Sequence, residues 1–310
     1  MTATDNLQTT AEKGPVPARL MRMATYASVT VASILVVAKL AAWSLTGSVA
    51  MLSTLVDSLL DGLASIITLI AVRHALTPAD QEHRFGHGKA EALAAMAQSA
   101  FVTGSAIIVL FHAGTRLFQP QKVVATEFGV VVIVGSIILT LALVAFQHYV
   151  VKRTNSLAIS ADTLHYKGDL LINVAVLVAL AATHFLDSIY IDPLFGAAIA
   201  LYLLFGAWRI LRSALDMLMD RELPESDRER IRAIAYRHKD VCSLHDLRTR
   251  RSGSDVFIQL HLELDPEITL MAAHLISDQV ELDIKQAFAD AEVLIHQDPE
   301  GYEEYETHGH

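Results

Sequence analysis

The sequence predicts a membrane protein in which an all-α domain of six transmembrane helices is followed by a small cytoplasmic α+β domain. The chain of 310 residues is 53% hydrophobic and only 19% charged, whereas soluble proteins carry about 25% charged residues. Its apolar residues are also unevenly distributed. They fill the chain from about residue 23 to 218, while residues from about 220 onward show the charged, alternating pattern of a soluble domain.

Six apolar runs predict the membrane-spanning helices, because each run is longer than the ~20 residues that cross the hydrocarbon core of a bilayer. Lys and Arg residues gather before the first run and in alternate connections between the runs. By the positive-inside rule, this distribution places both termini and the soluble domain in the cytoplasm. The runs cover about residues 23–46, 49–74, 91–118, 127–150, 157–185 and 191–215.

Composition divides the chain into successive segments. Residues 1–18 are polar and contain two prolines, so we expect a disordered lead and no cleavable signal peptide. We expect the six-helix transmembrane domain at residues 19–218 and the cytoplasmic α+β domain at residues 219–299. Residues 300–310 form an acidic tail.

The soluble part predicts the order helix, strand, strand, helix, strand, which is a ferredoxin-like αββαβ arrangement. A Ser-Gly-Ser turn at 252–254 separates the first two strands. In the second strand the even-numbered residues of 256–264 are apolar and share one face, while Phe257 and His261 lie on the opposite, polar face. The helices are expected at 225–238 and 270–288, and the strands at 244–250, 256–264 and 292–297.

Two carboxylates, Asp57 and Asp61, interrupt the second apolar run. They are four residues apart, so on a helix they lie on one face. A carboxylate near the bilayer centre costs about 2.5–3.5 kcal/mol on insertion scales, and a divalent cation is the compensation that we favour. The alternative is an interhelical salt bridge, for which Lys39 in the first run is an available base.

A second pair with the same spacing, His165 and Asp169, lies in the fifth apolar run. Facing Asp57 and Asp61, this pair would complete a set of one nitrogen and three oxygen ligands, which suits a tetrahedral Zn²⁺. Metal binding to such ligands displaces protons. A mid-membrane site that holds either metal or protons is the minimal requirement for metal–proton exchange.

Two further groups of metal-competent residues lie outside the apolar runs. The connection after the second run carries Asp80, His83 and His87, and a solvated polar loop is the alternative to a metal site there. The soluble domain carries a larger group on its strands and at the start of its second helix, for which unrelated surface histidines are the alternative. The residues of this group are His245, His261, His274, His296 and Asp298.

These motifs resemble the cation diffusion facilitator family, and in particular its bacterial ferrous-iron and zinc efflux branch. The resemblance covers the chain from about residue 20 to 299. It implies a homodimer in the bacterial inner membrane that exports divalent metal from the cytoplasm in exchange for protons. The matching stretches are 55–62, 78–91, 164–169, 245–250 and 295–299.

The resemblance also implies a role for each group of residues. The family's transport site falls on the same four intramembrane residues, and a loop zinc site falls on the three loop residues. A binuclear zinc site, bridged by Asp298, falls on the group in the soluble domain and braces the dimer. Lys89 and Asp220 match an interdomain salt bridge that acts as a hinge; the alternative is a solvated pair worth less than about 1 kcal/mol.

We therefore expect a secondary transporter that exchanges cytoplasmic Zn²⁺ for protons by alternating access, with Fe²⁺ and Cd²⁺ as alternative cargoes. Zn²⁺ is expected both as cargo and as a structural ion, with no organic cofactor. The net charge of −10 argues against a nucleic-acid partner. A metalloenzyme is disfavoured because the chain has no HExxH or nucleophile motif. A channel is disfavoured because its pore would need rings or loops of ligands. A primary pump is disfavoured because no Walker A pattern is present.

Overall fold

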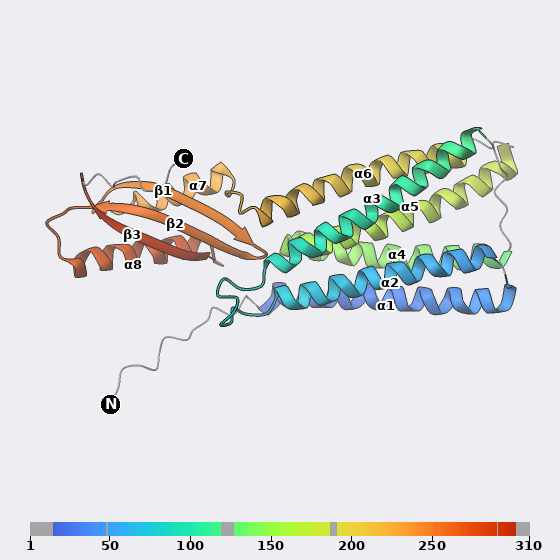
Figure 1. The fold of residues 1–310 in the computed structure, drawn as a ribbon, viewed down its shortest axis with the longest axis horizontal. Helices are drawn as coiled ribbons and strands as arrows, with labels where there is room; N and C mark the ends of the chain where they lie inside the picture. The colour runs from blue at the N-terminus through green and yellow to red at the C-terminus, as the bar shows by residue number, and fades with distance from the viewer. Residues whose placement is uncertain (1–14, 48, 119–126, 187–190, 290, 302–310) are drawn as a thin grey trace, which may run out of the picture. The chain divides into compact units, whose positions relative to one another are not determined.

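Figure 1 shows the computed structural model of the chain, which describes residues 15–47, 49–118, 127–186, 191–289 and 291–301. These residues divide into two compact units, with the boundary between Leu215 and Asp216. Each unit has a hydrophobic core of its own.

The N-terminal unit consists of six helices that are long and apolar enough to cross a membrane, which confirms the predicted all-α membrane domain. The first helix begins at Pro15, so residues 15–18 are helical and not part of a disordered lead. Proline is tolerated in a first turn because its missing N–H would have no intrahelical acceptor there. The helices are α1 (Pro15–Thr46), α2 (Val49–Ala75), α3 (Lys89–Phe118), α4 (Glu127–Thr154), α5 (Leu157–Leu186) and α6 (Ile191–Leu218).

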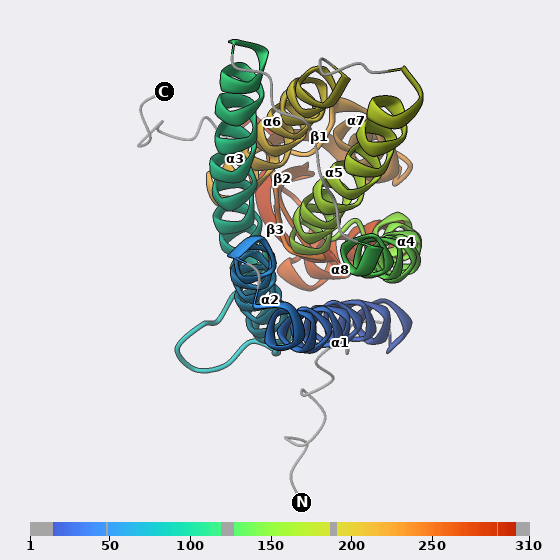
Figure 2. The same ribbon diagram turned by 90° about the vertical axis from the view of Figure 1, so that its right-hand side faces the viewer.

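Helix α1 packs against α2 and α4, and α5 packs against α3 and α4 (Figure 2). Large apolar side chains such as Val37, Ile70 and Phe111 are exposed on the outside of the unit, as expected for residues that meet lipid. The Leu164 side chain of α5 packs against α6, since a Cβ atom on Gly206 would lie 2.8 Å from its Cδ1 atom. A glycine at this position leaves room for the leucine.

The C-terminal unit has the predicted order of helix, strand, strand, helix and strand, which confirms the α+β fold. Strands β1 and β2 pair antiparallel, β2 and β3 pair parallel, and β2 lies in the centre of the sheet. The elements are α7 (Glu225–Ala235), β1 (Val241–Ser252), β2 (Asp255–Leu264), α8 (Leu270–Ala287) and β3 (Ala291–Pro299).

Both helices of the C-terminal unit cover the same face of its sheet. Ile258 of β2 is fully buried in one cluster with Ile231 of α7 and Ile284 of α8. The apolar face predicted for β2 is therefore the core. Phe257, expected on the polar face, is buried as well, and the guanidinium carbon of Arg250 lies 4.5 Å from the centroid of its ring.

Candidate metal centres

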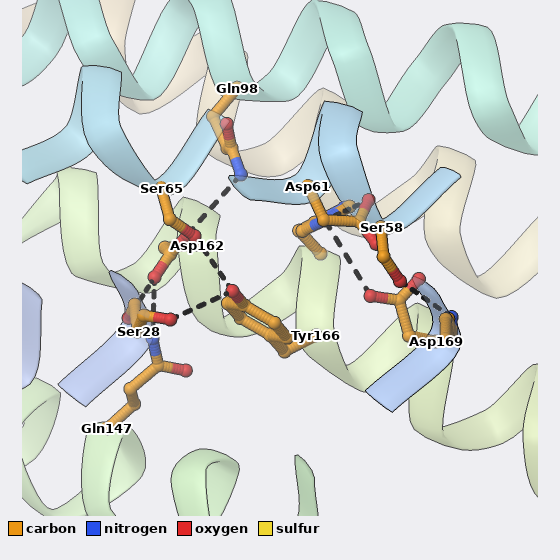
Figure 3. A network of polar contacts seen from close by, with 11 residues as sticks. Ser28, Ser58, Asp61, Ser65, Gln98, Gln147, Asp162, Tyr166 and Asp169 are labelled. Atoms are coloured by element: carbon orange, nitrogen blue, oxygen red, sulfur yellow. Dashed lines mark hydrogen bonds and ion pairs between the residues drawn. The ribbon is translucent and has the colours of Figure 1, made fainter. Parts of the chain in front are cut away.

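The intramembrane cluster brings together three of the four residues predicted for the transport site. Asp61 of α2 and His165 and Asp169 of α5 offer ligand atoms that all lie within 4.8 Å of one another. Nε2 of His165 is 3.0 Å from Oδ1 of Asp61 and 3.6 Å from Oδ2 of Asp169. Figure 3 shows the carboxylates of Asp61 and Asp169 turned toward each other between the two helices.

The donor set of this cluster fits a metal ion. His165 is buried, and its Nε2 atom faces carboxylate oxygens of Asp61 and Asp169. The imidazole ring is packed edge-on between Phe101, at 5.4 Å, and Tyr166, at 5.3 Å between centroids. A buried nitrogen that faces two carboxylate oxygens is suited to a shared cation, and mixed nitrogen and oxygen ligands suit Zn²⁺.

Asp57 lies outside the group that these three residues form. It is exposed on α2, one turn before Asp61, so its role as the fourth ligand stays a prediction. Lys39, the base available for a salt bridge, donates from Nζ to Oγ of the neighbouring Ser58 at 2.6 Å. Lys39 therefore lies beside the part of α2 that carries Asp57 and Asp61.

One buried carboxylate of α5, Asp162, was not anticipated from the sequence. It is 1% exposed and lies one turn before His165. Its partners are the neutral side chains Ser28, Gln98 and Gln147, each from a different helix. The sequence does contain a signal for it: an Asp within the fifth apolar run. Ionisable residues inside membrane helices are rare and usually functional.

The loop between α2 and α3 brings Asp80, His83 and His87 together, with ligand atoms within 4.8 Å of one another. Oδ1 of Asp80 accepts the backbone N–H groups of His83 at 2.6 Å and Glu82 at 2.9 Å. The His83 N–H is the main reason that the pKa of Asp80 lies below its ordinary value of 3.8. Nδ1 of His87 is 3.4 Å from the Thr77 carbonyl oxygen, while its Nε2 is 3.4 Å from Oδ2 of Asp80.

His74, in the last turn of α2, places another imidazole beside this loop. Its ring lies edge-on to that of His87, with 4.4 Å between centroids. His83 flanks the same ring of His87 at 4.7 Å. The loop group therefore has a histidine-rich surrounding that its sequence spacing did not indicate.

In the C-terminal unit, strand register places three histidines in a row. His245 of β1 is the direct partner of His261 of β2, and His261 is the direct partner of His296 of β3. Their ring centroids are 5.0 Å and 4.7 Å apart. The row lies on the face opposite the two helices, because His261 alternates with the buried even-numbered residues of β2.

Asp298 lies beside all three histidines, and its ligand atom forms one group within 4.8 Å with those of His245 and His261. It lies two residues after His296, on the same face of β3, and is 7% exposed. Its Oδ2 atom is 2.8 Å from Nδ1 of His261 and 3.4 Å from Nε2 of His245, while Oδ1 is 3.1 Å from Nε2 of His296. One carboxylate thus faces three imidazoles, and its role as a bridge between two metal ions stays a prediction.

Two predicted participants lie elsewhere. His274 is on α8, which covers the other face of the sheet, and its Nε2 is 3.5 Å from Oδ2 of Asp278. Asp220 lies 3.4 Å from Nη1 of Arg250 within the C-terminal unit. Lys89 belongs to the other unit, so the salt bridge with Asp220 stays a prediction.

Six apolar helices with an internal carboxylate–imidazole cluster, followed by a metal-competent α+β domain, define a multi-pass metal-ion transporter. Two family models match the chain: the cation efflux transmembrane domain over residues 25–219 and the cation efflux protein cytoplasmic domain over residues 223–300. The chain therefore belongs to the cation efflux family. It is a transporter and not an enzyme.

Curated relatives match nearly the whole chain. The cation-efflux pump FieF of Shewanella oneidensis is 50% identical over 279 residues, which cover 90% of this chain and 94% of that protein. FieF of Yersinia enterocolitica is 44% identical over 296 residues, covering 96% and 98%. The metal-bound C-terminal domain of the CzcD transporter from Thermotoga maritima is 29% identical, covers 26% of this chain and 93% of its own, and has a TM-score of 0.25.

Proposed function

We propose that this cation efflux transporter exports cytoplasmic Zn²⁺ in exchange for protons, with Fe²⁺ and Cd²⁺ as alternative cargoes. The observation that carries the proposal is the cluster of Asp61, His165 and Asp169 between α2 and α5. Asp57 supplies the fourth ligand. Affinity alone would favour copper over zinc in such a site, so the choice of metal depends on geometry and availability.

The exchange follows from what the cluster binds in each half of the cycle. With Zn²⁺ bound, the carboxylates are ionised and Nε2 of His165 directs its lone pair to the metal. When the metal leaves, unpaired carboxylates and an unpaired imidazole within the bilayer are costly, and protons taken up by the same oxygen and nitrogen atoms remove that cost. Alternation of the site between the two sides of the membrane then exchanges metal for protons.

The other two groups act on the cytoplasmic side in this proposal. Asp80, His83 and His87 receive metal from the cytoplasm, since the carboxylate and His83 are exposed. The histidine row with Asp298 binds Zn²⁺ and braces a homodimer of cytoplasmic domains. His274 is exposed on its helix, so it is available to a second chain.

In the proposed orientation the protein spans the bacterial inner membrane, and both of its termini lie in the cytoplasm. The last turn of α2 contains Arg73 and His74, and the last turn of α4 contains Lys152 and Arg153. Basic residues at these ends mark the cytoplasmic side by the positive-inside rule. An even number of spans returns the chain to the side on which it began.

Zinc flux into reconstituted vesicles under an imposed pH gradient tests the proposal. We expect flux to follow the gradient and to fall at least about tenfold in His165→Ala, because losing 1.4 kcal/mol of binding is already tenfold. His112→Ala is the matched control, since His112 is exposed on α3 outside the cluster. Zinc flux that ignores the pH gradient contradicts the exchange, and normal flux in His165→Ala contradicts the site.

A further inference from the structure

Asp162 is a buried carboxylate that accepts hydrogen bonds from three other helices. Its Oδ2 atom accepts from Oγ of Ser28 on α1 and from Nε2 of Gln147 on α4, both at 2.6 Å. Its Oδ1 atom is 3.5 Å from Nε2 of Gln98 on α3. Nε2 of Gln147 also donates to Oγ of Ser28 at 2.9 Å. Figure 3 shows the four side chains converging at one level of the bundle.

The same network also reaches α2, the helix that carries Asp57 and Asp61. Tyr166 follows Asp162 by one turn on α5, and its hydroxyl lies 2.8 Å from Oγ of Ser65 on α2. That hydroxyl also donates to the carbonyl oxygen of Ser28 at 3.3 Å. Ser65 in turn follows Asp61 by one turn. Side chains from α1 to α5 therefore meet in one connected network beside the transport cluster.

Helical geometry connects this network to the metal-competent residues. At 3.6 residues per turn, Asp162, His165, Tyr166 and Asp169 lie within one stripe of α5 about 100° wide. A rotation of α5 by about 20° displaces a side-chain atom about 6 Å from the helix axis by about 2 Å. Metal–ligand distances tolerate only about 0.2 Å, so the rotational setting of α5 decides whether its ligands can share an ion.

We infer that Asp162 is a positioning residue that fixes α5 against α1, α3 and α4, so that His165 and Asp169 face Asp61 in metal-binding geometry. A carboxylate suits this task because it accepts hydrogen bonds from several neutral donors at once. An apolar residue at the same position would remove the acceptor that Ser28 of α1 and Gln147 of α4 share on α5, and leave Ser28 with the Ala24 carbonyl oxygen of its own helix. The inference rests on the proposed transport site.

Visible absorption of Co²⁺ bound to the full-length protein tests the inference. The spectrum of His165→Ala is subtracted from that of each variant, which leaves the contribution of the transport cluster. We expect Asp162→Asn, which keeps the shape but replaces one acceptor oxygen by a donor, to reduce the tetrahedral cobalt bands at least twofold. We expect its KM for Zn²⁺ flux to rise about tenfold, as for the loss of a residue that orients metal ligands.

Two variants separate positioning from a general loss of structure. Thr163→Val removes a buried hydroxyl whose hydrogen bond, among the residues that the structure describes, stays within its own helix, to the Ile159 carbonyl oxygen. This variant should leave the cobalt spectrum and the KM unchanged. Asp162→Asn combined with Gln147→Glu exchanges the carboxylate and the amide across the same contact. This double variant should restore both the cobalt bands and the KM. Native bands and KM in Asp162→Asn, or no restoration in the exchanged pair, overturn the inference.

Two outcomes need a separate reading. If Asp162→Asn does not yield folded protein, Ser28→Ala removes one donor and keeps the carboxylate; it should weaken the cobalt bands in the same direction, and unchanged bands overturn the inference. If His165→Ala leaves the cobalt spectrum of the native chain unchanged, the proposed transport site is wrong and the positioning role falls with it.

Discussion

Asp298→Ala in the cytoplasmic domain gives a sharp test of the histidine row as a zinc site. In the native chain, zinc at 100 times its dissociation constant stabilises the domain by about 2.7 kcal/mol, if zinc does not bind the unfolded chain. Asp298 is the residue that contacts all three histidines of the row. If its loss weakens binding about 100-fold, the upper range for removal of residues that support metal ligands, the same zinc concentration contributes only about 0.4 kcal/mol.

Hydrogen exchange of the β2 amides in the full-length protein measures this difference, since core strands exchange through cooperative opening. Saturating zinc should slow exchange about 100-fold in the native chain and only about twofold in Asp298→Ala. The comparison within each variant, with and without zinc, removes any change in metal-free stability. Glu292→Ala is the matched control, because Glu292 is an exposed acid on the same strand. Equal zinc protection in Asp298→Ala and the native chain would refute the reasoning.

Two further predictions concern packing and charge. Gly206→Val should lower the thermal stability of the protein in detergent by about 1–3 kcal/mol, the usual range for overpacking, because any Cβ there meets Leu164. Gly104→Ala, with no atom within 4 Å of the added Cβ, should leave the stability unchanged; equal effects would contradict the packing of Leu164 against Gly206. The pKa of Asp80 is lowered chiefly by the His83 N–H. The ionised Asp80 carboxylate therefore stabilises the turn fully above its unfolded pKa of about 3.9, and this stabilisation is lost only as pH falls through the lower folded pKa. An NMR titration that finds Asp80 titrating above pH 4 would contradict this hydrogen bond.

The fold was predictable because its signals are local. Six apolar runs and the alternation of β2 each depend on residues that are close in the sequence, and the structure confirms both elements. The differences are also local in origin. Helix α1 starts at Pro15, where proline is compatible with a first turn, and Arg250 covers one side of the buried Phe257 ring.

Spacing of four residues was enough to place His165 and Asp169 on one face of a helix, and Asp57 and Asp61 on one face of another. It could not decide which of them meet across the two helices. The structure brings Asp61 to His165 and leaves Asp57 one turn away. That choice depends on how α2 and α5 are rotated and shifted against each other.

The Asp162 network shows most clearly what tertiary structure adds. Its partners Ser28, Gln98 and Gln147 lie on three other helices, up to 134 residues away in the chain. None of them is charged, so no pairing of opposite charges in the sequence marked them.

Hydropathy and helical periodicity act over one or two turns, so the membrane class, the order of elements and the residue types able to bind metal could all be inferred from the amino-acid sequence. Which of these residues meet depends on the packing of the folded chain. Strand register aligned His245, His261 and His296 across the sheet, and helix rotation set His165 against Asp61. Both depend on packing between segments distant in the chain, which no local pattern encodes.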